Sequence, residues 1–397
     1  MNTSDIQHFN LNRILLLSIG LWPYNQSKLV LFQQILLFGL LISFVIYQLI
    51  IFFITEFTIG FTITVFSFIL FYIAFIIEYN SFWSNGQAVK NLLEQFMHVC
   101  NELKDENEIN VMKKYASNTK RYTTGMILIV LAALPITIAA SIWPYILNIV
   151  KPKNESRSDF MIQLLTTHFA DPDKYRYLML LYMHITICIG GITKIATGTM
   201  LIGYLKYACG MFRIASYRIE RAMAINNLHG NLENKNVTYK GIVYAVVVHR
   251  KAMELCKSLM FSFEGTFFAL IAVDVLNLSL NLYRVFQSVS VGDNKEETII
   301  HVIIVLITLL YMFLANYAGQ EITDHNNHLF STAYNVHWYI APLHVQKLIL
   351  FLLQMGHKTF GLNVNGLFTA SLNCFASVRN ILLIKYTPQY RRLIIND

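Results

Sequence analysis

Charged residues are scarce in this sequence. Lys, Arg, Asp and Glu together make up 14% of the 397 residues, whereas 55% are hydrophobic. Soluble globular domains carry about 25% charged residues, so this composition excludes an ordinary soluble protein. Four long segments contain no Lys, Arg, Asp or Glu at all: 29–55, 57–77, 122–150 and 298–320. Each is long enough to cross the roughly 30 Å of bilayer hydrocarbon as a helix.

Motifs for catalysis and for cofactor binding are also missing. The chain has no nucleophile elbow, Gly-rich phosphate loop, metal-binding Cys cluster or paired-carboxylate motif. Its five cysteines fall in expected spans or cytosolic loops, which favours reduced, structural thiols. The apolar runs do not alternate with period two, which argues against a membrane barrel. We therefore expect neither an enzyme nor a protein with a cofactor or metal.

Three further segments are apolar with few interruptions. Lys194 alone interrupts 177–205, two charges interrupt 258–283, and 359–378 is uncharged after a short apolar segment at 348–355. The expected fold is an all-α polytopic membrane protein with seven transmembrane helices, approximately at 31–54, 57–78, 125–149, 177–205, 259–284, 298–318 and 360–384. Two helical regions at 206–258 and 319–358 should project into the cytosol. They are either solubilising hairpins or an anchor for subunit assembly.

The distribution of Lys and Arg predicts the orientation. Seven spans place the two termini on opposite sides of the membrane, and cytosolic loops carry the excess of Lys and Arg. With a cytosolic N-terminus, nineteen Lys and Arg residues lie on the cytosolic side and nine on the outer side. The N-terminus is therefore expected in the cytosol and the C-terminus outside. A G-protein-coupled receptor has the opposite orientation, and its Asp-Arg-Tyr and Asn-Pro-x-x-Tyr motifs are absent here.

A few charged residues fall within or near membrane depth: Lys194, Glu264, Asp274 and Arg284. An unpaired charge at the bilayer centre costs at least about 2.5 to 3.5 kcal/mol, so these side chains should pair or face water. We expect pairing between spans four and five. A transport or proton-relay role is the alternative, and it is weaker because one charge per span does not make a relay.

One helix face beyond span six carries three residues of the kinds that bind metals. Glu321, His325 and His328 are spaced i, i+4 and i+7, which brings them to one side of a helix. No zincin pattern accompanies them, and polar helix faces commonly carry such residues. An ordinary polar face is the preferred interpretation.

Aromatic residues gather in the outer half of the expected bundle. Aromatic side chains with a few polar tips suit small organic ligands. Taken singly, each residue is better explained by ordinary helix packing. The candidate ligand-binding residues are Phe68, Phe71 and Tyr72 on span two, Trp143 and Tyr145 on span three, Tyr182, Met183, His184 and Ile187 on span four, and Ile303, Ile307 and Tyr311 on span six.

The C-terminal third carries a recognisable pattern. It contains Gly319-Gln320-Glu321, Tyr334, Trp338, a short helical segment, Gly366-Leu367-Phe368 and the run Ser-Leu-Asn-Cys-Phe-Ala-Ser-Val at 371–378. This pattern resembles the insect odorant receptor family. The length, the number of spans and the long second outer loop agree with the resemblance. The chain is too short to resemble the shared co-receptor, so it resembles a ligand-tuning subunit.

The resemblance implies an ionotropic receptor of the cell membrane, expected in olfactory neuron dendrites. Such a receptor is a hetero-tetramer with the co-receptor, gated by a volatile small organic ligand and permeable to cations without selectivity. Its pocket lies in the outer half among spans two, three, four and six. Its cytosolic helices anchor the subunits to one another. Span seven lines its pore, here with Ser371, Phe375 and Val378.

The family pattern stops after Val378. A proline and basic residues follow, with Arg379, Pro388, Arg391 and Arg392 near the place of the expected gate. Rings of Arg would repel cations. We hypothesise that this tail comes from a retained intron, because codons for Val-Arg-Asn can open like a splice donor. Sequencing the transcript tests this hypothesis.

Two alternatives remain at the level of sequence. A gustatory-type receptor channel shares the architecture, but its Thr-Tyr-x5-Gln-Phe run in span seven is absent. A secondary transporter would show internal repeats with spans broken by Gly or Pro in matching halves. Pro135 and Pro144 interrupt span three, and no matching half accompanies them.

Overall fold

The computed structural model describes residues 10–54, 58–150, 172–228, 232–291, 295–356, 360–364, 366 and 368–381. Six long helices dominate it: α3 (Lys28–Ile54), α4 (Ile59–Ser84), α6 (Glu106–Val150), α8 (Pro172–Leu228), α9 (Leu232–Val291) and α10 (Lys295–Asn335). Each contains a stretch long and apolar enough to cross a membrane. The protein is a predominantly α-helical, multi-pass membrane protein, as the composition predicts.

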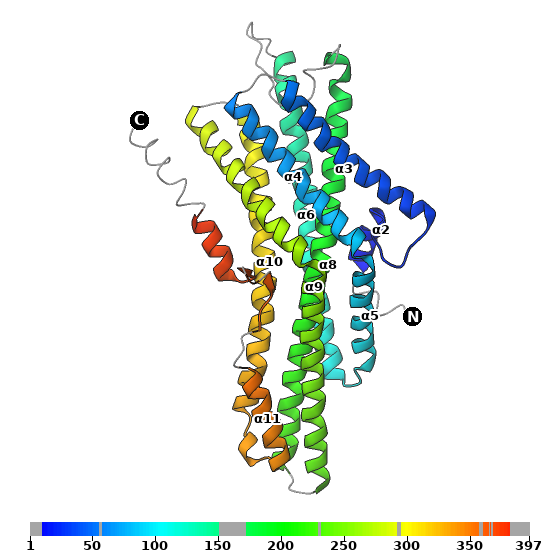
Figure 1. Cartoon of the computed structure of the whole chain (residues 1–397), viewed down its shortest axis with the longest axis vertical. Coiled ribbons are helices and arrows are strands. Elements are labelled where there is room, and N and C mark those ends of the chain that lie inside the picture. Colours follow the sequence, from blue (N-terminus) through cyan, green and yellow to red (C-terminus); the bar gives the residue numbers. More distant parts are fainter. Residues whose placement is uncertain are drawn as a thin grey trace.

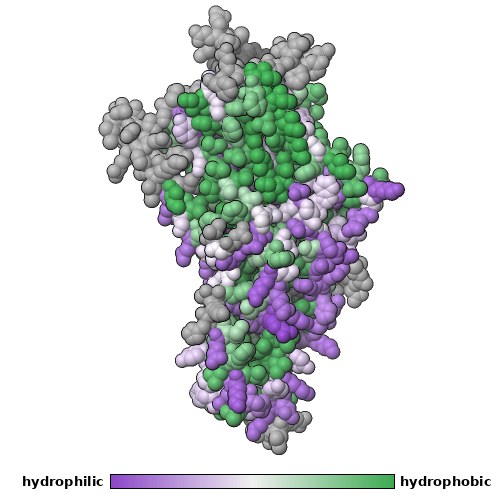
Figure 2. All heavy atoms as spheres, viewed as in Figure 1, coloured by the Kyte–Doolittle hydropathy of each residue, from purple (hydrophilic) through white to green (hydrophobic). Residues whose placement is uncertain are grey.

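The surface divides into two halves. On the face drawn in Figure 2, hydrophobic residues dominate the upper half of the molecule, and most hydrophilic residues lie in the lower half. Large apolar side chains in helices of the upper half are exposed, including Phe53 at 75% and Leu306 at 60%. Such exposure is unfavourable in water and is expected against lipid. The hydrophilic half is the one that the Lys and Arg count places in the cytosol.

The two longest helices join these halves. At 1.5 Å per residue, α8 with 57 residues and α9 with 60 are each about 85 to 90 Å long, far more than a bilayer requires. They lie side by side along the molecule and continue below the apolar half, where α10 and α11 (Leu343–Met355) join them (Figure 1). Helix α5 (Gly86–Glu102) covers the same region from another side.

The largest hydrophobic core lies mostly in this cytosolic half. Residues such as Phe96, Phe212, Ile242, Ile322 and Ile349 are at most 2% exposed and belong to one cluster. They come from α5, α8, α9, α10 and α11 respectively. The N-terminal helix α2 (Asn10–Ser18) extends this cluster and is tied to α8, because the side-chain amide of Asn12 donates a hydrogen bond to Thr199 Oγ1 at 2.8 Å.

The chain after α10 differs from the expected last span. The 3-10 helix η2 (Trp338–Ile340) and α11 come first, followed by an antiparallel hairpin of β1 (Asn363–Val364) and β2 (Phe368–Thr369). Gly366 has φ +70° in this turn, a conformation that L side chains rarely adopt. A helix then begins at 372 instead of 360 and is described to 381. Six membrane-crossing helices are therefore found among the described residues, and a seventh is not established.

Candidate functional site

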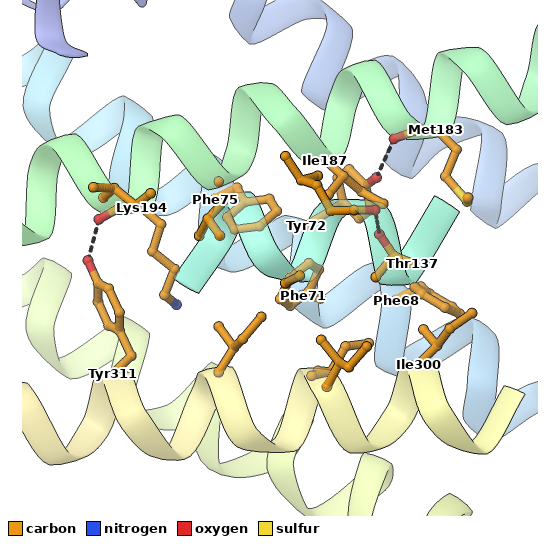
Figure 3. Close-up of a pocket in the computed structure, with 18 of the residues that line it drawn as sticks. Phe68, Phe71, Tyr72, Phe75, Thr137, Met183, Ile187, Lys194, Ile300 and Tyr311 are labelled. Carbon is orange, nitrogen blue, oxygen red and sulfur yellow. Dashed lines mark hydrogen bonds between the residues drawn. The ribbon is translucent and has the colours of Figure 1, made fainter. Parts of the chain in front are cut away.

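The apolar half contains a cavity of about 100 Å³ between five helices. Figure 3 shows α4, α8 and α10 around it, and α3 and α6 complete the wall. Almost all of its lining is aliphatic or aromatic. The lining residues are Phe44, Gln48, Phe68, Phe71, Tyr72, Phe75, Met126, Val130, Ala133, Leu134, Thr137, Met183, Ile187, Gly191, Lys194, Ile195, Ile300, Ile303, Ile304, Ile307 and Tyr311.

Helix α4 contributes a row of aromatic rings to this cavity. Phe68, Phe71, Tyr72 and Phe75 are spaced i, i+3, i+4 and i+7, so they share one face of the helix. The centroids of the Phe71 and Phe75 rings lie 4.6 Å apart, and that of Tyr72 lies 4.4 Å from Phe44 on α3. These contacts fix the rings in tilted and edge-on arrangements, which are the favourable geometries for aromatic pairs.

Helix α8 accommodates these rings through a glycine. A Cβ atom built on Gly190 would overlap the Phe75 ring, so only glycine lets α4 and α8 approach so closely here. Gly198 lies two turns further along α8, and a Cβ atom built on it would overlap the Tyr311 hydroxyl of α10. The two glycines therefore help to set the distances between the three helices that surround the cavity.

Most polar atoms of the wall already have partners. The Tyr72 hydroxyl is within 3.0 Å of Thr186 Oγ1, and Thr137 Oγ1 donates to the Leu134 carbonyl at 2.9 Å. Two further polar side chains line the cavity. Gln48 Oε1 is buried and has no hydrogen-bond partner among the described residues, and the Lys194 ammonium lies at one end of the cavity. The cavity is thus an apolar space with very few polar groups to orient a ligand.

The structure brings together eight of the twelve candidate ligand-binding residues. The cavity is lined by Phe68, Phe71, Tyr72, Met183, Ile187, Ile303, Ile307 and Tyr311. Tyr182 does not, because its hydroxyl lies 2.6 Å from Ser43 Oγ in the contact between α8 and α3. The His184 ring is buried away from the cavity, with Nδ1 2.7 Å from the Leu180 carbonyl oxygen. Trp143 and Tyr145 lie at the end of α6, where side chains are outside the described residues.

Comparison with known proteins now identifies the family. A sequence model described as the 7tm odorant receptor family matches residues 58–382. The chain belongs to this odorant receptor family. Because the match spans most of the chain, it decides against the gustatory-type receptor, the transporter and the G-protein-coupled receptor. Neither this family nor this fold is that of an enzyme.

Two solved structures have the same fold as this odorant receptor. One is the insect olfactory receptor OR5 from Machilis hrabei in complex with eugenol, with a TM-score of 0.75 and 13% identity over 98% of both chains. The other is described as the same receptor, with a TM-score of 0.74 and 14% identity over 96% of this chain and 97% of that one. Among curated proteins, none matches this sequence.

Two of the four charged residues expected at membrane depth, Lys194 and Asp274, pair with each other. Lys194 Nζ lies 3.8 Å from Asp274 Oδ1, which confirms the expected pairing between spans four and five. A third member, Glu78 on α4, lies 3.6 Å from the same ammonium and was not anticipated. Arg284 donates a hydrogen bond to Gln287 at 2.9 Å. Pairing of this kind offsets part of the cost of burying each charge.

The three residues on the polar helix face beyond span six each contact a different side chain. Glu321 forms an ion pair with Lys206, the His325 Nε2 atom lies 2.6 Å from the Tyr115 hydroxyl, and the His328 Nε2 atom lies 3.2 Å from Arg213. No group of His, Cys, Asp and Glu side chains that could hold a metal is found in the described part of this odorant receptor.

The residues expected to line the pore lie where the helix at 372–381 meets α10 and α9. The Ser371 backbone N–H donates to Asn316 Oδ1 at 3.1 Å, and the Phe375 ring packs edge-on against Phe313 at 5.5 Å. Val378 packs beside Leu278 and Val305. The basic tail continues beyond residue 381, and 382–397 lie outside the described residues.

Proposed function

We propose that this odorant receptor is a ligand-tuning subunit that binds a volatile organic molecule in the cavity and opens a cation channel together with a co-receptor. The observation that carries the proposal is the apolar cavity in the membrane half of an odorant receptor fold. Burial of apolar ligand surface is the main source of affinity for such a space. The OR5 structure named above holds eugenol, a small aromatic molecule, which supports a ligand of this class.

Helix α10 connects the cavity to the proposed pore helix. Ile300, Ile303 and Ile307 line the cavity, and Phe313 and Asn316, about two to three turns further along, contact Phe375 and Ser371. A ligand shifts a gating equilibrium only when it binds one state more tightly than the other. A ligand that moves or rotates α10 at the cavity therefore also moves the proposed pore helix, which contacts α10 at Phe313 and Asn316.

The proposed assembly is a hetero-tetramer with the co-receptor in the cell membrane of olfactory neuron dendrites. Its subunits would meet through the cytosolic helices of α8, α9, α10 and α11, and the pore would be lined by Ser371, Phe375 and Val378. The long cytosolic extensions support this role, because solubilising hairpins alone do not require a core with so many fully buried side chains.

Recording odour-evoked currents tests the proposal. The full chain is expressed in cells with and without a co-receptor, and a panel of volatile compounds is applied. We expect inward cation currents only when both subunits are present, with a compound selectivity that differs from that of the co-receptor alone. Surface labelling of both subunits serves as the control for expression. Currents that require G-protein signalling, or no current from a complex that reaches the surface, would contradict the proposal.

A further inference from the structure

One end of the cavity is charged, although the rest is apolar. Figure 3 shows the Lys194 side chain reaching from α8 towards the space between α4 and α10, with Tyr311 beside it. Both residues line the cavity, at the end opposite Ile300 and Met183. A purely hydrocarbon ligand would gain nothing from an ammonium group in this position, so the charged end calls for its own explanation.

The contacts of the ammonium are long. Lys194 Nζ lies 3.6 Å from Glu78 Oε1 and 3.8 Å from Asp274 Oδ1, both beyond the 2.7 to 3.2 Å of an ordinary N–H···O hydrogen bond. It also lies 4.4 Å from the centroid of the Tyr311 ring, in cation–π distance. An ammonium has three N–H donors, and these distances leave it able to donate to a further oxygen.

Burial of the ammonium strengthens such a hydrogen bond. The side chains of Lys194, Glu78 and Asp274 are 8%, 5% and 11% exposed, so bulk water does not compete strongly for the ammonium. Hydrogen bonds to charged groups are stronger than those between neutral groups, and more so where water is excluded. A ligand oxygen at this end of the cavity would therefore contribute both affinity and orientation.

The sign of the charges limits what the ligand can be. Glu78, Lys194 and Asp274 carry a formal net charge of −1, but of these three only Lys194 lines the cavity. A cationic amine would face the ammonium, and a carboxylate would add a second excess negative charge in a low-dielectric site. A neutral oxygen acceptor meets neither penalty.

We propose that Lys194 anchors neutral, oxygen-containing odorants such as ketones, aldehydes and esters by donating a hydrogen bond at this end of the cavity. This inference rests on the proposed function, and it names the ligand class of the same site. The apolar wall then holds the hydrocarbon part of the ligand, and Lys194 sets which end of the ligand lies next to Tyr311.

The test compares ligands of equal size on the full chain co-expressed with a co-receptor. The probes are a methyl ketone, a hydrocarbon, a carboxylic acid and a primary amine with the same number of heavy atoms. The wild-type receptor should respond to the ketone at concentrations about tenfold or more below those needed for the other three, the size expected for one charge-assisted hydrogen bond. Moving the carbonyl stepwise towards the middle of the chain should remove this preference, and this series needs no variant.

Substitution of Lys194 supplies the second arm. Because Lys194→Met alone would leave two buried carboxylates unpaired, it is combined with Glu78→Gln and Asp274→Asn. The triple variant should lose the ketone preference and keep its hydrocarbon response. Lys113→Met, the same change at an exposed site, should behave like the wild type. If the triple variant does not reach the surface, the carbonyl series alone decides.

Several results would overturn the proposal. Equal responses of the wild-type receptor to the ketone and the hydrocarbon would overturn it, and so would a preference for the acid or the amine. A preference for ketones that does not depend on the position of the carbonyl would also overturn it. Loss of the ketone preference in Gln48→Met but not in the triple variant would assign the anchor to Gln48. Silence towards every probe and towards a broad odorant panel, from a complex at the surface, would instead contradict the proposed function itself.

Discussion

The cytosolic half and the membrane half of this receptor are built differently. In the cytosolic half, α5, α8, α9, α10 and α11 share one continuous core, and aromatic rings such as Phe96 and Tyr207 lie with centroids only 3.7 Å apart. Ion pairs tie neighbouring helices together there, including Glu108 with Arg218 and Arg221 with Asp105. The membrane half instead contains an apolar cavity, and the large apolar side chains on its outer surface are expected to contact lipid.

Because of this difference, we expect stability to depend mainly on the cytosolic half and ligand binding to depend mainly on the membrane half. The shared core of the cytosolic half provides a base for the proposed subunit assembly, because a packed core tolerates few alternative arrangements. The cavity lowers the packing of the membrane half and leaves room for a ligand to select among arrangements of its helices. Substitutions in the first half should therefore change stability, and substitutions around the cavity should change ligand response.

The largest effect is expected from Phe212→Ala. Phe212 on α8 is 0% exposed and its ring lies near those of His249 and Phe360, at 5.6 and 6.3 Å. Removing a fully buried phenyl ring costs about 3 to 5 kcal/mol of stability. Thermal unfolding of the purified receptor should show a clear drop in Tm. Phe261→Ala, at a site 86% exposed, is the matched control, and equal losses for both variants would refute the proposed contrast between buried and exposed sites.

The second-largest effect is expected from breaking the ion pair between α6 and α8. Arg218 Nε and an Arg218 terminal nitrogen donate to the two oxygens of Glu108 at 2.6 and 2.7 Å, and Glu108 is only 5% exposed. Arg218→Met leaves this carboxylate buried without its cation, which should cost about 2 to 3 kcal/mol of unfolding free energy. Adding Glu108→Leu removes the unpaired charge and should restore most of the loss. A double variant as unstable as the single one would show that packing, not charge, is responsible.

Filling the cavity should change ligand response more than stability. Ile307→Phe places a larger side chain in the space between α4 and α10 and should raise the effective odorant concentration about tenfold, equivalent to about 1.4 kcal/mol. The Tm should change little, because the extra atoms enter a cavity and not a packed core. Leu306→Phe, one residue away and 60% exposed, is the control. Unchanged potency in Ile307→Phe would exclude the cavity as the odorant site.

Local patterns in the sequence predict part of this cavity. The aromatic spacing on α4 identifies Phe68, Phe71 and Tyr72, and continuing the same face by one turn would have added Phe75. Ile300 and Ile304 follow by the same helical spacing from Ile303 and Ile307. Met126, Val130 and Thr137 on α6 carry no such signal, because their position depends on how α6 is rotated against α8 and α10.

The charged end of the cavity could also be predicted only in part from the sequence. Pairing of Lys194 with Asp274 could be predicted because unpaired charges at membrane depth are costly. Glu78 is the last residue of the span expected at 57–78, a position where a carboxylate can reach water, and only the depth at which α4 crosses α8 brings it to Lys194. The start of the helix at 372 was missed for a related reason, since an uncharged run does not distinguish helix from a tight hairpin around Gly366.

The smallest effect is expected at an exposed pair of the cytosolic half. Lys251 Nζ donates a hydrogen bond to Glu102 Oε2 at 2.7 Å, and this holds the pKa of the Glu102 carboxyl below its ordinary value. A lowered folded-state pKa stabilises the fold above the pKa of the unfolded chain, and the contribution disappears as the pH falls through the folded-state value. With the Glu102 side chain 52% exposed, Glu102→Gln should cost less than about 1 kcal/mol at pH 7. The Tm difference from wild type should shrink towards pH 4 and in high salt, whereas a loss comparable to that of Arg218→Met would show that exposed and buried pairs contribute alike.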